Sequence, residues 1–117
     1  MTWLFVATSC NHNDALFGRW TVEKVNVAFD ESKATPEMVR QYGEMEKGNI
    51  IEIGKDSLLT FISDGDTLRG RCSLKGEILY CDGRVFGTIH DGLLMTETST
   101  PLGVVKVSYV NPQGIEP

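Results

Sequence analysis

The chain contains few of the residues that most often carry chemistry, with three cysteines and two histidines among its 117 residues. Nucleophilic catalysis needs a base within hydrogen-bond reach of a nucleophile. His12 lies in a polar segment and His90 precedes an Asp-Gly turn, so neither is placed beside a nucleophile by the sequence. Cys72 and Cys81 would need two further ligands to hold a zinc ion, and none lies nearby in the sequence. We therefore expect no catalytic residues, no metal site and no cofactor.

Clustered basic residues and long apolar runs are missing as well. The net charge is −5 and the eleven lysines and arginines are scattered, with Arg69 and Arg71 as the one close pair. This distribution argues against a nucleic-acid partner. No stretch approaches about 18 consecutive apolar residues, which a transmembrane helix requires. The length and a hydrophobic content of 41% fit one domain with one core, and we expect a monomer.

The first residues have a composition of their own. Residues 3–7 are apolar, residues 7–9 are small, Cys10 follows, and residues 11–14 are polar. This order resembles the lipobox of bacterial lipoproteins, in which the cysteine becomes the mature N-terminus and carries acyl chains. The resemblance implies a signal remnant, lipobox and spacer over residues 1–14. It also implies a lipid anchor at Cys10 and a location in the cell envelope, at the outer membrane, facing the periplasm or the cell surface. The alternative is a β-strand over residues 2–8.

Short β-type runs separated by turn residues fill most of the remaining chain. The first covers residues 16–29, and its alternation breaks at Glu23-Lys24, which suggests a bulge. Seven further strands are predicted over residues 49–53, 57–63, 66–75, 78–81, 84–90, 93–99 and 104–110. Three of the turns between them are Asp-Gly pairs, which favour type I′ hairpins. An aspartate at such a turn stabilises the backbone.

One segment has a helical pattern instead. Thr35 suits the N-cap and Pro36 suits the first helical position, so we predict a helix over residues 36–46. Its apolar stripe consists of Met38, Val39, Tyr42 and Met45. Because this helix lies in the one long connection, between the first and second strands, we expect it to cross one mouth of the barrel.

Eight short strands joined by tight hairpins favour an antiparallel meander that closes into a barrel, because closure removes unpaired edges. The predicted fold class is therefore all-β, with an eight-stranded meander barrel over residues 15–111, one short helix between the first two strands, and a tail over residues 112–117.

The G-x-W sequence Gly18-Arg19-Trp20 at the start of the first strand, followed by a long connection and a meander, resembles the lipocalin-like barrels. The chain is similar to the small lipocalin-like domains of Bacteroidetes-type envelope lipoproteins. The resemblance implies that Gly18 and Trp20 close one end of the barrel.

Cys72 and Cys81 flank a hairpin whose register follows from its turn. If Gly76-Glu77 forms a type II′ turn, Cys72 lies opposite Cys81 as a non-hydrogen-bonded pair. An inter-strand disulfide is then possible, and two buried free thiols are equally compatible with the pattern. The same register predicts one inward face, made of Leu68, Cys72, Leu74, Leu79 and Cys81.

Two non-catalytic functions are compatible with these features. In the first, the barrel is filled by bulky inward residues and acts as a protein-interaction or accessory module through its surface; these residues are Leu59, Phe61, Val105, Val107 and Tyr109. In the second, the helix stripe is a lid over a small apolar ligand in the interior. Inhibition of a secreted hydrolase is a lesser form of the first. Short strands enclose little volume, which favours the interaction function.

Overall fold

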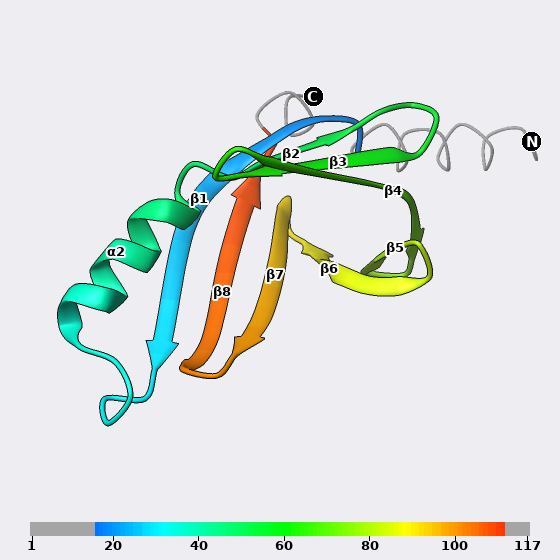
Figure 1. Cartoon of the computed structure of the whole chain (residues 1–117). Helices are drawn as coiled ribbons and strands as arrows, with labels where there is room; N and C mark the ends of the chain where they lie inside the picture. Colours follow the sequence, from blue (N-terminus) through cyan, green and yellow to red (C-terminus); the bar gives the residue numbers. More distant parts are fainter. Residues whose placement is uncertain (1–15, 112–117) are drawn as a thin grey trace, which may run out of the picture.

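The computed structural model describes residues 16–111. Within them, eight strands follow one another around a closed antiparallel barrel in sequence order, and the last pairs with the first. The strands are β1 (Gly18–Phe29), β2 (Ile50–Ile53), β3 (Leu58–Ser63), β4 (Asp66–Lys75), β5 (Ile78–Cys81), β6 (Arg84–His90), β7 (Leu93–Thr100) and β8 (Gly103–Val110). The helix α2 (Pro36–Glu46) joins β1 to β2 (Figure 1). The predicted fold is confirmed. Cys10 and the alternative strand over residues 2–8 lie outside the described residues.

The turns have the backbone that their sequences predict. In each of the pairs Asp64-Gly65, Asp82-Gly83 and Asp91-Gly92 both residues have positive φ, at 49° to 53° for the aspartates and 78° to 85° for the glycines. A type I′ turn requires this combination. Gly76 has a φ of 63° and Glu77 is not in the left-handed region, as in a type II′ turn. Local turn chemistry therefore sets the hairpin registers.

The helix also begins where its sequence predicts. The Thr35 hydroxyl accepts a hydrogen bond from the Met38 amide at 3.2 Å, and Pro36 occupies the first turn. The Thr35 amide in turn donates to the Met38 sulfur at 3.5 Å. Met38 therefore belongs to the cap of the helix as well as to its predicted apolar stripe.

One end of the barrel, where β1 begins, packs around Trp20, and we call it the closed end; a mostly polar pocket of about 200 Å³ lies at its edge, beside Leu16, Ile53 and Cys72. Trp20 is 2% exposed, and its indole Nε1–H donates to the Leu16 carbonyl at 2.9 Å. The Asn111 amide Nδ2 donates to the Phe17 carbonyl at 2.7 Å. Gly18 has a φ of 119°, and a Cβ there would lie 3.0 Å from Asn111 Nδ2. Glycine at this position lets the two ends of the described chain pack together.

The opposite end is open, and we call it the mouth. β1 pairs with β2 only from Gly18 to Thr21, whereas its pairing with β8 runs to Phe29, with the predicted bulge between Val22 and Lys24. Beyond β2, the strands β1, β8 and β7 continue as a three-stranded ribbon (Figure 1). α2 lies beside β1 there, and the Tyr42 ring meets the Phe29 ring edge-on, with centroids 5.3 Å apart.

One predicted inward residue is in fact exposed. Leu68 lies opposite Phe61 in the β3–β4 ladder and has the same alternation as buried Cys72, but 67% of its surface is accessible. Its strand position is at the mouth, past the point where the opposite wall of the barrel covers the inner face. Leu68 is therefore on the predicted face but outside the core.

Trp20 gives a direct test of the closed end. We expect Trp20→Ala to destabilise the domain by about 3 to 5 kcal/mol, because it removes a fully buried indole and leaves a cavity. The loss is a large share of the stability of a small domain. Chemical denaturation followed by circular dichroism measures it. Leu68→Ala is the matched control and should change the free energy of unfolding by less than about 0.5 kcal/mol. Equal effects of the two substitutions would contradict this packing.

Candidate functional site

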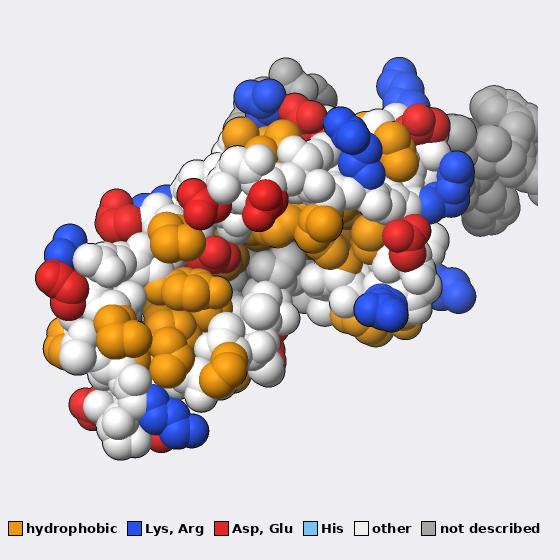
Figure 2. Space-filling model, in the orientation of Figure 1, with side chains coloured by type: hydrophobic (Ala, Val, Ile, Leu, Met, Phe, Trp, Pro, Cys, Tyr) orange, Lys and Arg blue, Asp and Glu red, His pale blue; other side chains and the backbone are white. Residues whose placement is uncertain are grey.

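The mouth carries apolar side chains that the core does not cover. On one side Phe29 and Tyr42 pack together, and on the other the Phe61 and Phe86 rings meet edge-on, with centroids 6.0 Å apart. Leu68 extends beyond Phe61 on the same inner face. Figure 2 shows apolar side chains gathered beside α2 over the β1–β8 ribbon, and a second group below β3 and β4. The mouth is therefore an apolar surface that is open to solvent.

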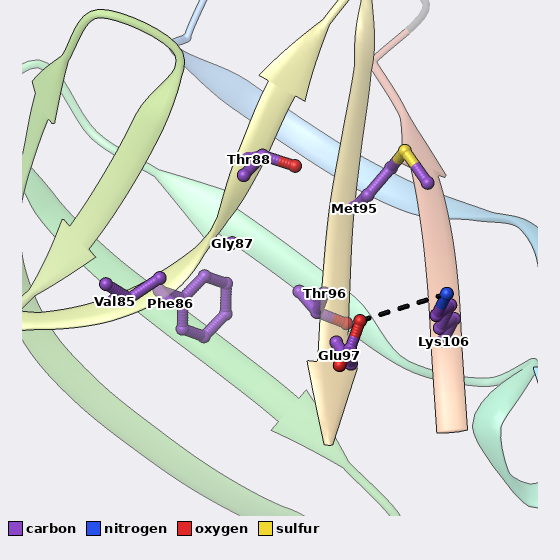
Figure 3. A pocket seen from close by; sticks show the side chains of 8 residues that line it. All are labelled: Val85, Phe86, Gly87, Thr88, Met95, Thr96, Glu97 and Lys106. Atoms are coloured by element: carbon purple, nitrogen blue, oxygen red, sulfur yellow. Dashed lines mark ion pairs between the residues drawn. The ribbon is translucent and has the colours of Figure 1, made fainter. Parts of the chain in front are cut away.

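Two pockets open at this end and share Phe86. The first, which we call the groove, has a volume of about 220 Å³ between β3, β4 and the β5–β6 hairpin, and Phe61, Leu68 and Cys81 contribute to its lining. The second, which we call the seam, has a volume of about 230 Å³ between β6 and β7 (Figure 3). Pockets for drug-sized ligands usually measure about 300 to 1,000 Å³. Each of these two sites suits a few side chains better than a large ligand.

A polar group lies beneath the apolar walls. The Asn49 amide Nδ2 donates to the Tyr109 hydroxyl at 3.2 Å and to Glu46 Oε1 at 3.0 Å. Asn49 is 1% exposed and its Oδ1 has no hydrogen-bond partner among the described residues. Burial raises the pKa of Tyr109, so its hydroxyl stays protonated. The sequence predicts Tyr109 in the interior but not its bond to Asn49, because the two residues lie 60 positions apart.

The predicted lid residues have different environments. Tyr42 packs against the core through Phe29, and Val39 is half-buried. Met38 and Met45 are 39% and 49% exposed. α2 buries none of its residues completely. The four side chains therefore do not form one continuous cover over an interior, and Tyr42 makes the main contact between α2 and the barrel.

The two cysteines face each other across the β4–β5 ladder in the predicted register. The Cys72 amide donates to the Ser57 carbonyl at 2.8 Å and so points away from β5, as expected of a non-hydrogen-bonded pair. Both thiols are free in the structure. A Cβ on Gly70 would meet Cys81 Sγ, so glycine is needed for this thiol to fit. Burial raises the pKa of both thiols, and the neighbouring Cys81 raises that of Cys72 further.

His90 lies on the surface at the closed end, away from the groove and the seam. Its Nδ1 lies 2.7 Å from Glu77 Oε2, and its Nε2 lies 3.2 Å from Asp91 Oδ2. The hydrogen bond with Glu77 and the charge of Asp91 raise the pKa of His90 above its ordinary value. Both ring nitrogens face carboxylates, an arrangement that favours a protonated imidazole over a general base for a nucleophile.

Comparisons with protein-family models, with curated proteins and with solved structures gave no match to this chain. Among residues 16–111, no helix is long and apolar enough to cross a membrane. In the same part of the chain, no group of three or more histidine, cysteine, aspartate or glutamate side chains is placed to hold a metal ion. The candidate site is therefore defined by its own geometry, which consists of the apolar mouth with its groove and its seam.

The contact between α2 and the barrel predicts unequal effects within the apolar stripe. Tyr42→Ala should lower the free energy of unfolding by about 1 to 3 kcal/mol, because it empties the space beside Phe29. Met45→Ala should change it by less than about 0.5 kcal/mol, because that side chain is half exposed. Urea unfolding of both variants measures the difference. A large loss in Met45→Ala would indicate that α2 packs through the whole stripe.

The environment of the cysteines predicts low thiol reactivity. Because the pKa of each thiol is raised from a usual value near 9.0, the thiolate is scarce at neutral pH. Iodoacetamide should alkylate both residues much more slowly in the folded protein than in urea, and faster as the pH rises. We also expect a disulfide oxidant to link them, since a non-hydrogen-bonded pair places its Cα atoms about 4.5 Å apart. Mass spectrometry measures both alkylation and disulfide formation. Alkylation that is equally fast in the folded and unfolded states would contradict the predicted low reactivity of the thiols.

Proposed function

We propose that this protein is a non-catalytic binding module of the bacterial cell envelope, held to the membrane by a lipid on Cys10, whose mouth binds an apolar segment of a protein partner. The observation that carries the binding proposal is the contrast between the two ends of the barrel. The interior is filled by Trp20, Ile51, Leu79, Leu94 and Tyr109, each at most 2% exposed. The mouth leaves apolar side chains accessible, with Leu68 at 67%. Such a surface on a soluble domain often marks an interaction site.

A small apolar ligand is the second candidate, and the size of the pockets counts against it. The groove and the seam each hold less volume than is usual for such sites. The fully buried side chains also leave little room deeper in the barrel. The groove and the seam are each lined by side chains from several strands, which suits protruding side chains of another protein.

The proposed anchor would also orient the mouth. The described chain enters at the closed end, where Leu16 and Phe17 contact Trp20 and Asn111. A lipid on Cys10 lies six residues before Leu16 in the sequence. Six residues span at most about 20 Å. On this proposal the closed end stays near the membrane surface and the mouth faces away from it, toward a partner.

Site-directed photo-crosslinking in the native host tests the binding proposal. A photoreactive residue at Leu68, in the groove, should link to one dominant protein. The same residue at Ile78, which faces outward at the closed end, should not. Purified partner should then bind the wild-type protein and lose about tenfold or more in affinity to Leu68→Arg, because a charge would be desolvated in the contact. Lipid adducts at Leu68 would support the small-ligand candidate instead.

The anchor is tested separately in the same cells. Cys10→Ser should abolish acylation and move the protein from the membrane fraction to the soluble fraction. Membrane fractionation that does not change would contradict the anchor and leave the binding proposal standing.

A further inference from the structure

The seam lies along the shortest ladder among the described strands. Within the described residues, the ladder between β6 and β7 has three pairs, which end at Thr88 opposite Met95. The register between β5 and β6 shifts at Phe86, which indicates a bulge. Bulges bend and twist a strand, and they occur often at barrel rims. A Cβ on Gly87 would meet the Met95 carbonyl oxygen at 2.5 Å, so glycine is required where the two strands last touch. Past this point β6 leaves β7.

The divergence leaves unpaired backbone on the β7 side of the seam. His90 and Leu93 flank the two-residue Asp91-Gly92 turn and form a hydrogen-bonded pair, so Leu93 and Met95 direct their backbone groups toward β6. By the same alternation Glu97, at the seam, and Ser99, beyond it, direct their N–H and C=O groups to the edge of β7 that faces away from β8, while Thr96 and Thr98 bond to β8. The described residues supply no backbone partner for Glu97 or Ser99.

The β6 side of the seam also offers backbone. Cys81 and Arg84 flank the Asp82-Gly83 turn, so the next pair, Tyr80 and Val85, is non-hydrogen-bonded. Val85 therefore directs its N–H and C=O away from β5 and toward the seam. Val85 is also 65% exposed. Backbone groups thus face the seam from both walls.

The side chains around the seam differ between its inner and outer faces. Figure 3 shows the Phe86 ring in the space between β6 and β7, and Thr96 lies on the same inner face as buried Val107. Glu97 and Lys106 lie on the outer face and form a loose ion pair at 4.0 Å. Successive side chains of a strand point to opposite faces. The side chains of a strand added here would therefore face the Phe86 ring and the charged groups of Glu97 and Lys106 in turn.

We propose that the seam accepts one extended segment of the protein partner, which pairs with the free edge of β7 at Glu97 and Ser99 and completes the barrel wall. The inference rests on the proposed function and specifies how the partner binds. An extended peptide supplies backbone donors and acceptors at the spacing that a strand edge presents, as in other cases of strand addition. The partner segment should carry apolar residues at alternate positions, facing Phe86, with polar residues between them. A lipid would leave the edge groups of β7 unpaired.

Peptide selection tests the proposal with a matched pair of variants. A phage-displayed library of random nine-residue peptides is selected on the wild-type protein. Ser99→Pro removes an N–H on the free edge of β7, and Ser99→Ala keeps it. Proline is tolerated at a strand edge whose N–H is unpaired, so both variants should fold. We expect the selected peptides to alternate apolar and polar residues, to bind Ser99→Ala as they bind wild type, and to lose about tenfold or more in affinity for Ser99→Pro.

Contacts observed by NMR give a second readout that does not depend on a variant folding. In the complex with wild type, backbone protons of the peptide should show nuclear Overhauser effects to the amides of Glu97 and Ser99.

Peptides that bind through Phe61 and Leu68, without these contacts, would overturn strand addition and leave the proposed function intact. Failure to select any peptide, together with binding of fatty acids at the mouth, would overturn both strand addition and the proposed binding of a protein partner. A concentration-dependent dimer that Ser99→Pro abolishes would overturn the foreign partner in favour of a second copy of the chain.

Discussion

The ladder between β1 and β8 closes the barrel, and because it is longer than the ladder between β1 and β2, the barrel wall is complete at one end only. β1 has 12 residues and pairs with β8 as far as Phe29, but β2 has four residues and pairs with β1 only through Thr21. A barrel wall can be continuous only where every strand has two neighbours. The closed end satisfies this condition and packs around Trp20. At the mouth the wall is incomplete, and α2 occupies one of the two gaps beside the β1–β8–β7 ribbon while the seam is the other.

Much of the fold could be predicted from the sequence because the determining signals are local. The Asp-Gly pairs require positive φ at both residues, so their turns and the flanking strands follow from a few adjacent positions. The start of α2 follows from Thr35 and Pro36 in the same way. That Cys72 lies opposite Cys81 follows from the Gly76-Glu77 turn alone, and the structure has the predicted register.

The mouth could not be predicted, because it depends on differences between strands far apart in the sequence. Alternation places Leu68 on the inner face correctly, but its exposure depends on where the opposite wall ends. The stripe of α2 predicts a cover, yet Met38 and Met45 remain exposed because the barrel beside them is only a ribbon. The bond between Asn49 and Tyr109, and the loss of β6–β7 pairing beyond the Thr88–Met95 pair, are likewise set by tertiary structure. The residues that matter for binding are therefore the ones that local patterns describe least well.

In the free protein the closed end should carry the stability of the domain, while the mouth and the seam stay open. Native-state hydrogen exchange measures this directly, residue by residue. We expect the slowest exchange in the first half of β1, in β2 and in the second half of β8. In β7 we expect an alternating pattern, with Glu97 and Ser99 exchanging rapidly and Thr96 and Thr98 protected. Uniform protection along β7, or protection at the mouth equal to that at the closed end, would contradict it.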